Sequence, residues 1–231
     1  MSVPLYLIMT NPKISTTIRL LIWLMAGVII STITLGWWQY SEPYDFFQDT
    51  ISSLGGNLSK SGFANPTSAL ILTIGFSLCS VISLTISLLY FFNKQLFWHT
   101  GKAIIALFIV IGGIGIAIPR DHLQLSVYHG LGAMLFIAAF GFFNGVLQLL
   151  RYSHKHRSKN PTNPAEKKTF DFYLDLSLVY LTLLSSLFYL VIHILAASFH
   201  VEVQWMSTAS AQKIVVIIAC VAVFLLDLDD I

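Results

Sequence analysis

Six long apolar runs dominate the sequence and decide what the chain can fold into. They cover residues 20–38, 67–92, 103–118, 127–150, 172–199 and 210–226. A helix needs about 20 apolar residues to cross a hydrocarbon core about 30 Å thick. Only 10% of the 231 residues are charged, whereas soluble domains carry about 25%. We therefore expect an all-α polytopic membrane protein, in which residues 1–231 form one bundle of six transmembrane helices.

The two shortest runs, residues 103–118 and 210–226, leave two possibilities open. Each can span the membrane if flanking polar residues reach outward, or it can lie beside water-filled space. We expect the first run to be a retained helix and not a cleaved signal peptide, because the bulky stretch from Trp37 to Tyr40 follows it where small residues would be needed. These aromatic side chains are typical of the membrane boundary instead.

The basic residues indicate the orientation of the helices. Short cytoplasmic loops carry an excess of Lys and Arg. Ten of the 13 basic residues fall on one side of the six runs, six of them in the loop 151–168. The exceptions are Lys60, Arg120 and Lys213. This alternation predicts a multi-pass protein with both termini in the cytoplasm.

The basic cytoplasmic loop, residues 151–168, has two interpretations. Its bases could attract anionic headgroups, each contributing about 1 kcal/mol near the surface. It could equally be a polar linker, rich in Asn and Pro, whose charges only set the topology. The sequence leaves both open.

Small residues predict how two of the helices pack. Gly112, Gly113 and Gly115 lie in one run, and Gly141 and Gly145 lie in the next. Small residues let helix backbones approach closely in lipid. Because only a short turn joins these runs, we expect antiparallel neighbours packed through the glycines, with a dimer face as the alternative.

Polar and charged side chains gather on the predicted outer side, although ionisable groups are costly near the membrane. We expect them to form an outward-facing pocket that binds a lipid headgroup or a small polar solute, with no cofactor. The residues of this pocket are Asp45, Asp49, Ser52, Ser53, Asn65, Arg120, Asp121, His129 and Lys213. Membrane lipids are the expected partners and nucleic acid is not, while the oligomeric state stays open.

The loop that contains Asp45 and Asp49 has a helical pattern. Ser41 followed by Pro43 is typical of a helix start, and Gly55 of a helix end. Asp45 and Asp49 are four apart and would share a face. The pattern predicts a short amphipathic helix on the outer side of the bundle.

An enzymatic alternative uses the histidines of the same layer. Two or three of the histidines His129, His193 and His200, with one of Asp45, Asp49 or Asp121, could form the site of a catalytic zinc, which needs three protein ligands and one open position. A zinc-bound water could then attack a lipid ester or amide. A purely structural network, such as Asp49 with Lys213 or Arg120, is the simpler alternative. A small transporter or channel ranks third, because three of the runs offer no charge near mid-membrane.

Two motifs resemble a known family. The segment Ser52-Ser53-Leu54-Gly55, followed by Asn65-Pro66, and the segment Pro119-Arg120-Asp121, followed by His129 and Ala133, are similar to a prokaryotic six-helix membrane family of unknown function (DUF998-like). That family is in turn distantly similar to DRAM-type membrane proteins linked to lipid handling and autophagy. The resemblance spans nearly the whole chain and implies six helices but no assigned activity. The matching positions are Asp49, Ser52, Ser53, Gly55, Asn65, Asp121 and His129.

Overall fold

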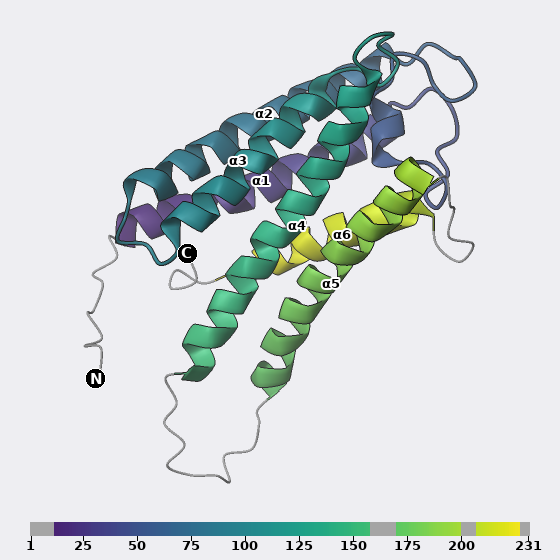
Figure 1. The fold of residues 1–231 in the computed structure, drawn as a ribbon. Coiled ribbons are helices and arrows are strands. Elements are labelled where there is room, and N and C mark those ends of the chain that lie inside the picture. Colours follow the sequence, from purple (N-terminus) through teal and green to yellow (C-terminus); the bar gives the residue numbers. More distant parts are fainter. Residues whose placement is uncertain (1–11, 158–169, 200–206, 227–231) are drawn as a thin grey trace.

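The computed structural model describes residues 12–157, 170–199 and 207–226 (Figure 1). These residues form α-helices and one short 3₁₀ helix, and the expected all-α class is confirmed. The helices are α1 (Pro12–Trp38), α2 (Pro66–Phe92), α3 (His99–Ala117), α4 (Ser126–Arg157), α5 (Phe170–Phe199) and α6 (Thr208–Val223), with η1 at Ile51–Gly55. Several helices extend beyond the apolar runs, because polar residues continue the helical hydrogen bonding outside the hydrocarbon.

Five of these helices, α1 to α5, are long and apolar enough to cross a membrane, whereas α6 has only 16 residues. Their outward surfaces carry large apolar side chains. Leu70, Val81, Ile114 and Leu184 are all more than half exposed. Such a surface would aggregate in water but suits lipid. The protein is therefore a multi-pass integral membrane protein.

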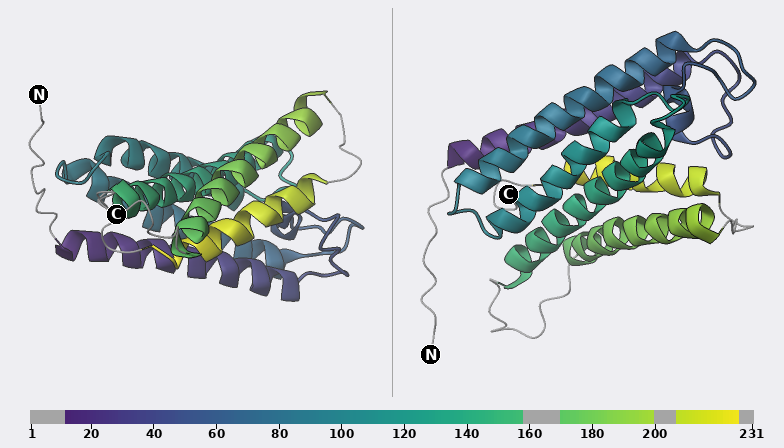
Figure 2. Two further views of the ribbon diagram at one scale, coloured as in Figure 1. Left: turned by 90° about the horizontal axis from the view of Figure 1, so that it is seen from below. Right: turned by 45° about the horizontal axis from the view of Figure 1, so that its top comes forward.

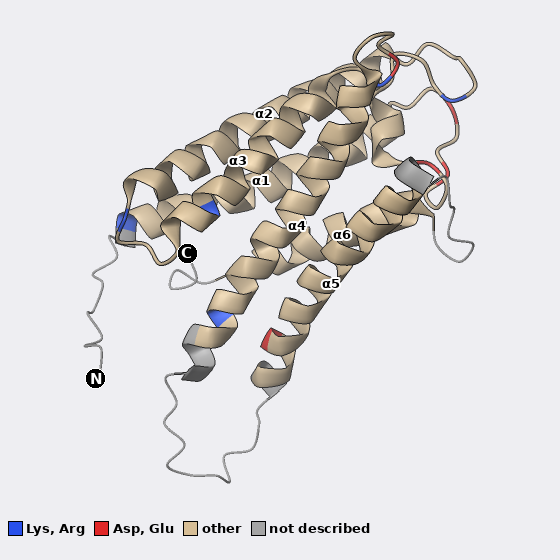
Figure 3. Ribbon diagram, in the orientation of Figure 1, with Lys and Arg blue, Asp and Glu red and all other residues tan. Residues whose placement is uncertain are grey.

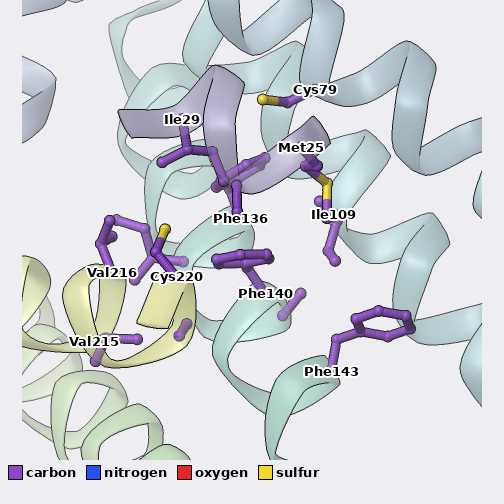
Figure 4. Packing of buried hydrophobic residues seen from close by; sticks show 14 of the residues in the cluster. Met25, Ile29, Cys79, Ile109, Phe136, Phe140, Phe143, Val215, Val216 and Cys220 are labelled. Carbon is purple, nitrogen blue, oxygen red and sulfur yellow. The ribbon is translucent and has the colours of Figure 1, made fainter. Parts of the chain in front are cut away.

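Helices that follow one another in the chain pack side by side, as expected when short loops join them (Figures 1 and 2). The helix α4 lies at the centre and contacts α3, α5 and α6. Its Phe136, Phe140 and Phe143 are buried, and they meet Met25 of α1 and Val215 of α6 in the core (Figure 4). Both cysteines are free and buried in this core.

Glycines bring α3 and α4 into backbone contact, which confirms the predicted pairing. A Cβ added at Gly132 would lie 2.5 Å from the Cα of Gly115, and one at Gly112 would lie 2.4 Å from the amide nitrogen of Phe136. Gly141 and Gly145 do not belong to this contact, contrary to the prediction, because they face Ser186 and Leu183 of α5. The five residues from Phe136 to Gly141 turn the helix by about 140°, so that it presents another side.

Charged residues of the described chain gather at the two ends of the bundle (Figure 3). At the end where α1 begins, an ion pair of 3.2 Å joins Arg151 of α4 to Asp175 of α5, and the Asp175 side chain is only 1% exposed. Nearby, the Gln148 side chain donates a hydrogen bond of 2.7 Å to the Ala222 carbonyl. These contacts tie α4 to both α5 and α6 at this end.

Candidate functional site

The chain between α1 and α2, residues 39–65, covers the opposite end of the bundle, and we refer to it as the cap (Figure 1). The predicted amphipathic helix starting at Ser41 is not formed, and only η1 is helical here. The Asp45 side chain explains the difference. Its Oδ1 accepts hydrogen bonds from the amides of Phe47 and Gln48, at 2.8 and 3.1 Å. A short carboxylate that binds nearby amides competes with helix formation and favours a turn.

Asp49 is the centre of one half of the cap. Its Oδ2 accepts a hydrogen bond of 2.8 Å from the Asp45 amide, and its Oδ1 lies 3.0 Å from the Lys60 ammonium. Burial opposes ionisation, but the amide and the ammonium outweigh it and lower the pKa of Asp49 below its usual range. The predicted pairing of this carboxylate with Lys213 or Arg120 is therefore wrong, and Lys60 is its partner.

The first turns of α6 hold the same segment of the cap. The Lys213 ammonium donates to the carbonyls of Phe46 and Asp49. The Gln212 side chain accepts a hydrogen bond of 2.8 Å from the Ile51 amide. Lys213 thus contacts the Asp49 backbone instead of the Asp49 carboxylate, and α6 fastens the start of η1.

Asp121, in the turn between α3 and α4, fastens the other half of the cap. Its Oδ1 accepts from the amide and the side chain of Asn57, both at 3.1 Å, and its Oδ2 accepts from the Leu58 amide at 2.9 Å. Partial burial raises the pKa of this carboxyl, but the donors outweigh it and the net shift is downward. The neighbouring Arg120 amide donates to the Gly55 carbonyl at 3.3 Å.

Acid should loosen the cap, because a carboxyl group with a lowered folded-state pKa stabilises only when ionised. The contribution of Asp49 and Asp121 is complete above the unfolded pKa of about 4 and is lost as the pH falls through the lower folded values. A spin label on Ser61→Cys, at an exposed position, should become mobile below pH 4 and stay unchanged between pH 8 and 5. Asp121→Asn is the matched control and should show a weaker response, whereas a loosening centred above pH 5 would contradict this assignment.

Asn65 and His129 lie beneath η1, and each is only 2% exposed. The Asn65 side-chain amide donates to the Gly56 carbonyl at 2.9 Å, and the His129 ring bonds the Ile118 carbonyl through Nδ1. A carbonyl only accepts, so Nδ1 carries the hydrogen and Nε2 of the neutral ring is an acceptor. Asn65 Oδ1 and His129 Nε2 have no hydrogen-bond partner among the described residues. A Cβ at Gly55 would lie 3.4 Å from the His129 ring.

The serines of the cap have a local role. Both Ser52 and Ser53 hydroxyls bond the Thr50 hydroxyl, at 2.9 and 3.0 Å, where η1 begins. Sequence reasoning missed two further contributors, Ser68 and Lys60. Ser68 donates to the Leu54 carbonyl at 2.8 Å. A hydroxyl in the first turn of an apolar helix was the only available signal for it.

The histidines proposed for zinc do not come together in the described part of the chain. The Nδ1 of His129 is already bonded, and the His193 ring packs against Tyr189 with 5.6 Å between ring centroids. His200 lies outside the described residues. Within residues 12–157, 170–199 and 207–226, no three His, Cys, Asp or Glu side chains form a group that could hold a metal. The zinc hypothesis therefore gains no ligand set here.

No protein-family model, curated protein or solved structure matches this chain. The family resemblance stays a prediction.

Proposed function

We propose that this membrane protein binds, beneath its cap, the polar head of a lipid that carries hydrogen-bond donors. The observation that carries the proposal is the pair of buried acceptors without donors, Asn65 Oδ1 and His129 Nε2. A buried polar group left unpaired costs about 1–3 kcal/mol. A hydroxyl or ammonium group of a ligand offers the donors that both atoms lack.

The surroundings of the cap favour a lipid over a free solute. Trp37, Trp38, Phe47 and Phe63 are each more than half exposed around this end. Exposed aromatic rings are enriched where the membrane meets water, so they support placing the cap at headgroup depth. The exposed Arg120, whose amide bonds Gly55, adds a positive charge beside η1 that suits a lipid phosphate.

We also propose that all six helices cross the membrane, with both termini in the cytoplasm and the cap outside. The helix α6 measures about 24 Å at 1.5 Å per residue, somewhat short of the core. The cap covers its first turns through Gln212 and Lys213, and a locally thinner bilayer or water can make up the rest. Lys13 at the start of α1, Lys94 after α2 and Arg151 near the end of α4 support this orientation, because they lie at the uncapped end.

A series of headgroups tests the binding proposal. Phosphatidylethanolamine loses its donors stepwise on N-methylation and has none as phosphatidylcholine. With identical acyl chains, we expect the rise in melting temperature to be largest for phosphatidylethanolamine and to shrink along the series. Losing a hydrogen bond to a charged donor costs about 1.5–3 kcal/mol, which corresponds to at least tenfold weaker binding.

Two variants make this test specific. For both, the quantity compared is the difference between the rise in melting temperature with phosphatidylethanolamine and the rise with phosphatidylcholine. His129→Leu should abolish that difference, even if it lowers the starting stability. His122→Ala, at an exposed histidine of the same end, should keep it. Equal stabilisation by both lipids, or a difference that survives His129→Leu, would overturn the proposal. If soluble phosphoethanolamine stabilised the protein as much as phosphatidylethanolamine does, the ligand would be a small polar solute and not a lipid.

A further inference from the structure

A second feature lies on the lipid-facing side of α1 and α2. A groove of about 740 Å³ runs between these helices, and its lining includes Trp23, Gly27, Leu35, Ile74 and Phe224. Leu35 and Ile74 are about half exposed, so the groove opens toward the surrounding lipid. None of the residues that line this groove lies in the cap, and neither Asn65 nor His129 is among them.

The floor of the groove is formed where the two helices touch. A Cβ added at Gly75 would lie 2.0 Å from the Thr32 hydroxyl, so α1 and α2 leave no passage between them there. At Gly27 the situation is the opposite, since an added Cβ would meet nothing within 4 Å. Gly27 thus keeps the middle of the groove open.

The groove is longer than an acyl chain of one leaflet, so a chain that enters at its Arg19 end fills only part of it. Residues four apart form a ridge along one side of a helix, and α1 carries such a ridge from Arg19 through Trp23 and Gly27 to Leu35. The 12 residues from Trp23 to Leu35 rise about 18 Å. Half of a hydrocarbon core measures about 15 Å.

Arg19 stands at one end of this ridge and has no ion-pair partner among the residues that the structure describes. Its guanidinium lies 4.9 Å from the centroid of the Trp23 ring, and its Nε is buried without a hydrogen-bond partner. No carboxylate of the described residues forms an ion pair with it. The Trp23 ring is itself fixed, because its Nε1 donates a hydrogen bond of 3.0 Å to the Val223 carbonyl.

The depth of Arg19 suits a headgroup. The 19 residues from Arg19 to Trp38 span about 28 Å, close to the thickness of the core. With Trp38 at the boundary beside the cap, Arg19 falls at the opposite boundary. A guanidinium there binds phosphate oxygens with two parallel hydrogen bonds.

We infer that the α1–α2 groove binds an anionic phospholipid of the leaflet at the uncapped end, with one acyl chain in the groove and its phosphate on Arg19. The charge complementarity selects this occupant over a helix of a second copy, whose apolar face would leave the guanidinium without an anion. The inference is independent of the headgroup proposal at the cap, because the two phosphate positions lie at opposite ends of the bundle and the two sites share no residue.

Native mass spectrometry of the full chain with His129→Leu tests this site, since this substitution removes the cap acceptor that the hydroxyl groups of phosphatidylglycerol would otherwise also bind. Phosphatidylglycerol and phosphatidylcholine with identical acyl chains are added in equal amounts, and the lipid retained is counted. We expect one phosphatidylglycerol to be held in preference. Arg19→Gln should weaken its retention about fivefold, since one basic residue near the surface contributes about that factor, and should remove the preference between the lipids.

A groove-filling variant separates the chain from the headgroup. Gly27→Leu should displace both lipids from this site and leave the melting temperature in detergent unchanged, because the added side chain meets open space. Gly130→Leu on α4 is the matched control, since its Cβ also meets nothing within 4 Å, and it should bind as the wild type does. His129→Leu should leave lipid binding in the groove intact. A failure of the groove inference can therefore be told apart from a failure of the headgroup proposal at the cap.

Three outcomes would overturn the inference. Arg19→Gln could keep the wild-type preference for phosphatidylglycerol, which would exclude the phosphate contact. Gly27→Leu could retain the lipid, which would place it elsewhere on the surface. A dimer that Gly27→Leu dissociates would show that a second copy occupies the groove.

Discussion

Replacing Gly132 by valine should lower the free energy of unfolding by about 3 kcal/mol, at the upper end of the usual cost of overpacking. The new Cβ would lie 2.5 Å from the Cα of Gly115. Backbone atoms cannot swing aside as a side chain can, so α3 and α4 would have to separate. In lipid that contact is not replaced by a hydrophobic driving force. Unfolding in mixed micelles with rising SDS, followed by circular dichroism, measures the loss.

Gly130→Val is the control for this experiment. The two glycines lie two residues apart on α4, and valine has the same helix propensity at both. A Cβ at Gly130 meets nothing within 4 Å, so this variant should stay within about 0.5 kcal/mol of the wild type. Equal losses in the two variants would mean that propensity, and not the contact between α3 and α4, explains the effect.

Asp175→Leu should be the most damaging single change at the uncapped end, with a loss of about 3–5 kcal/mol. The Arg151 side chain is 11% exposed, and replacing Asp175 breaks its buried ion pair while the guanidinium stays buried. Arg151→Leu combined with Asp175→Leu should recover most of the stability, because a buried ion pair replaced by two apolar side chains of suitable size costs less than the loss of one partner alone.

The pair at the cap provides the comparison. Lys60 is 66% exposed in its ion pair with Asp49, so Lys60→Met should cost no more than about 1 kcal/mol. The same unfolding measurement serves for all three variants. A double variant as unstable as Asp175→Leu alone would show that the ion pair is not the reason for the loss.

The helices were predictable because hydrophobic length alone specifies them, and five of the six runs correspond to helices long enough to span. The absence of a helix from Ser41 onward was not predictable, because the spacing of apolar residues does not show whether the Asp45 carboxylate will bind nearby amides. The Asp45 carboxylate accepts hydrogen bonds from the amides of Phe47 and Gln48, and these bonds favour a turn over the predicted helix. The partners of Gly141 were also beyond the sequence, since the rotation of α4 depends on all its neighbours.

The candidate site was predicted as a set of residues but not as an arrangement. Asp49, Asp121, Asn65 and His129 do lie at one end of the bundle, as charge and topology indicated. The structure uses the two carboxylates to hold backbone amides of the cap, so they are not free to meet a ligand. A sequence does not distinguish these uses, because a carboxylate accepts equally well from an amide of its own chain or from a ligand.

The accessibility of single cysteines in intact cells tests the proposed orientation of the six helices most directly. Three variants each carry one new cysteine. Ser61→Cys lies in the cap, Gln95→Cys lies between α2 and α3, and in the third variant a cysteine is added after Ile231. Wild-type Cys79 and Cys220 are buried and give a low background. A membrane-impermeant maleimide should label Ser61→Cys in intact cells and the other two only after permeabilisation. Labelling of Gln95→Cys from outside would contradict the orientation, and labelling of the third cysteine from outside would contradict a spanning α6.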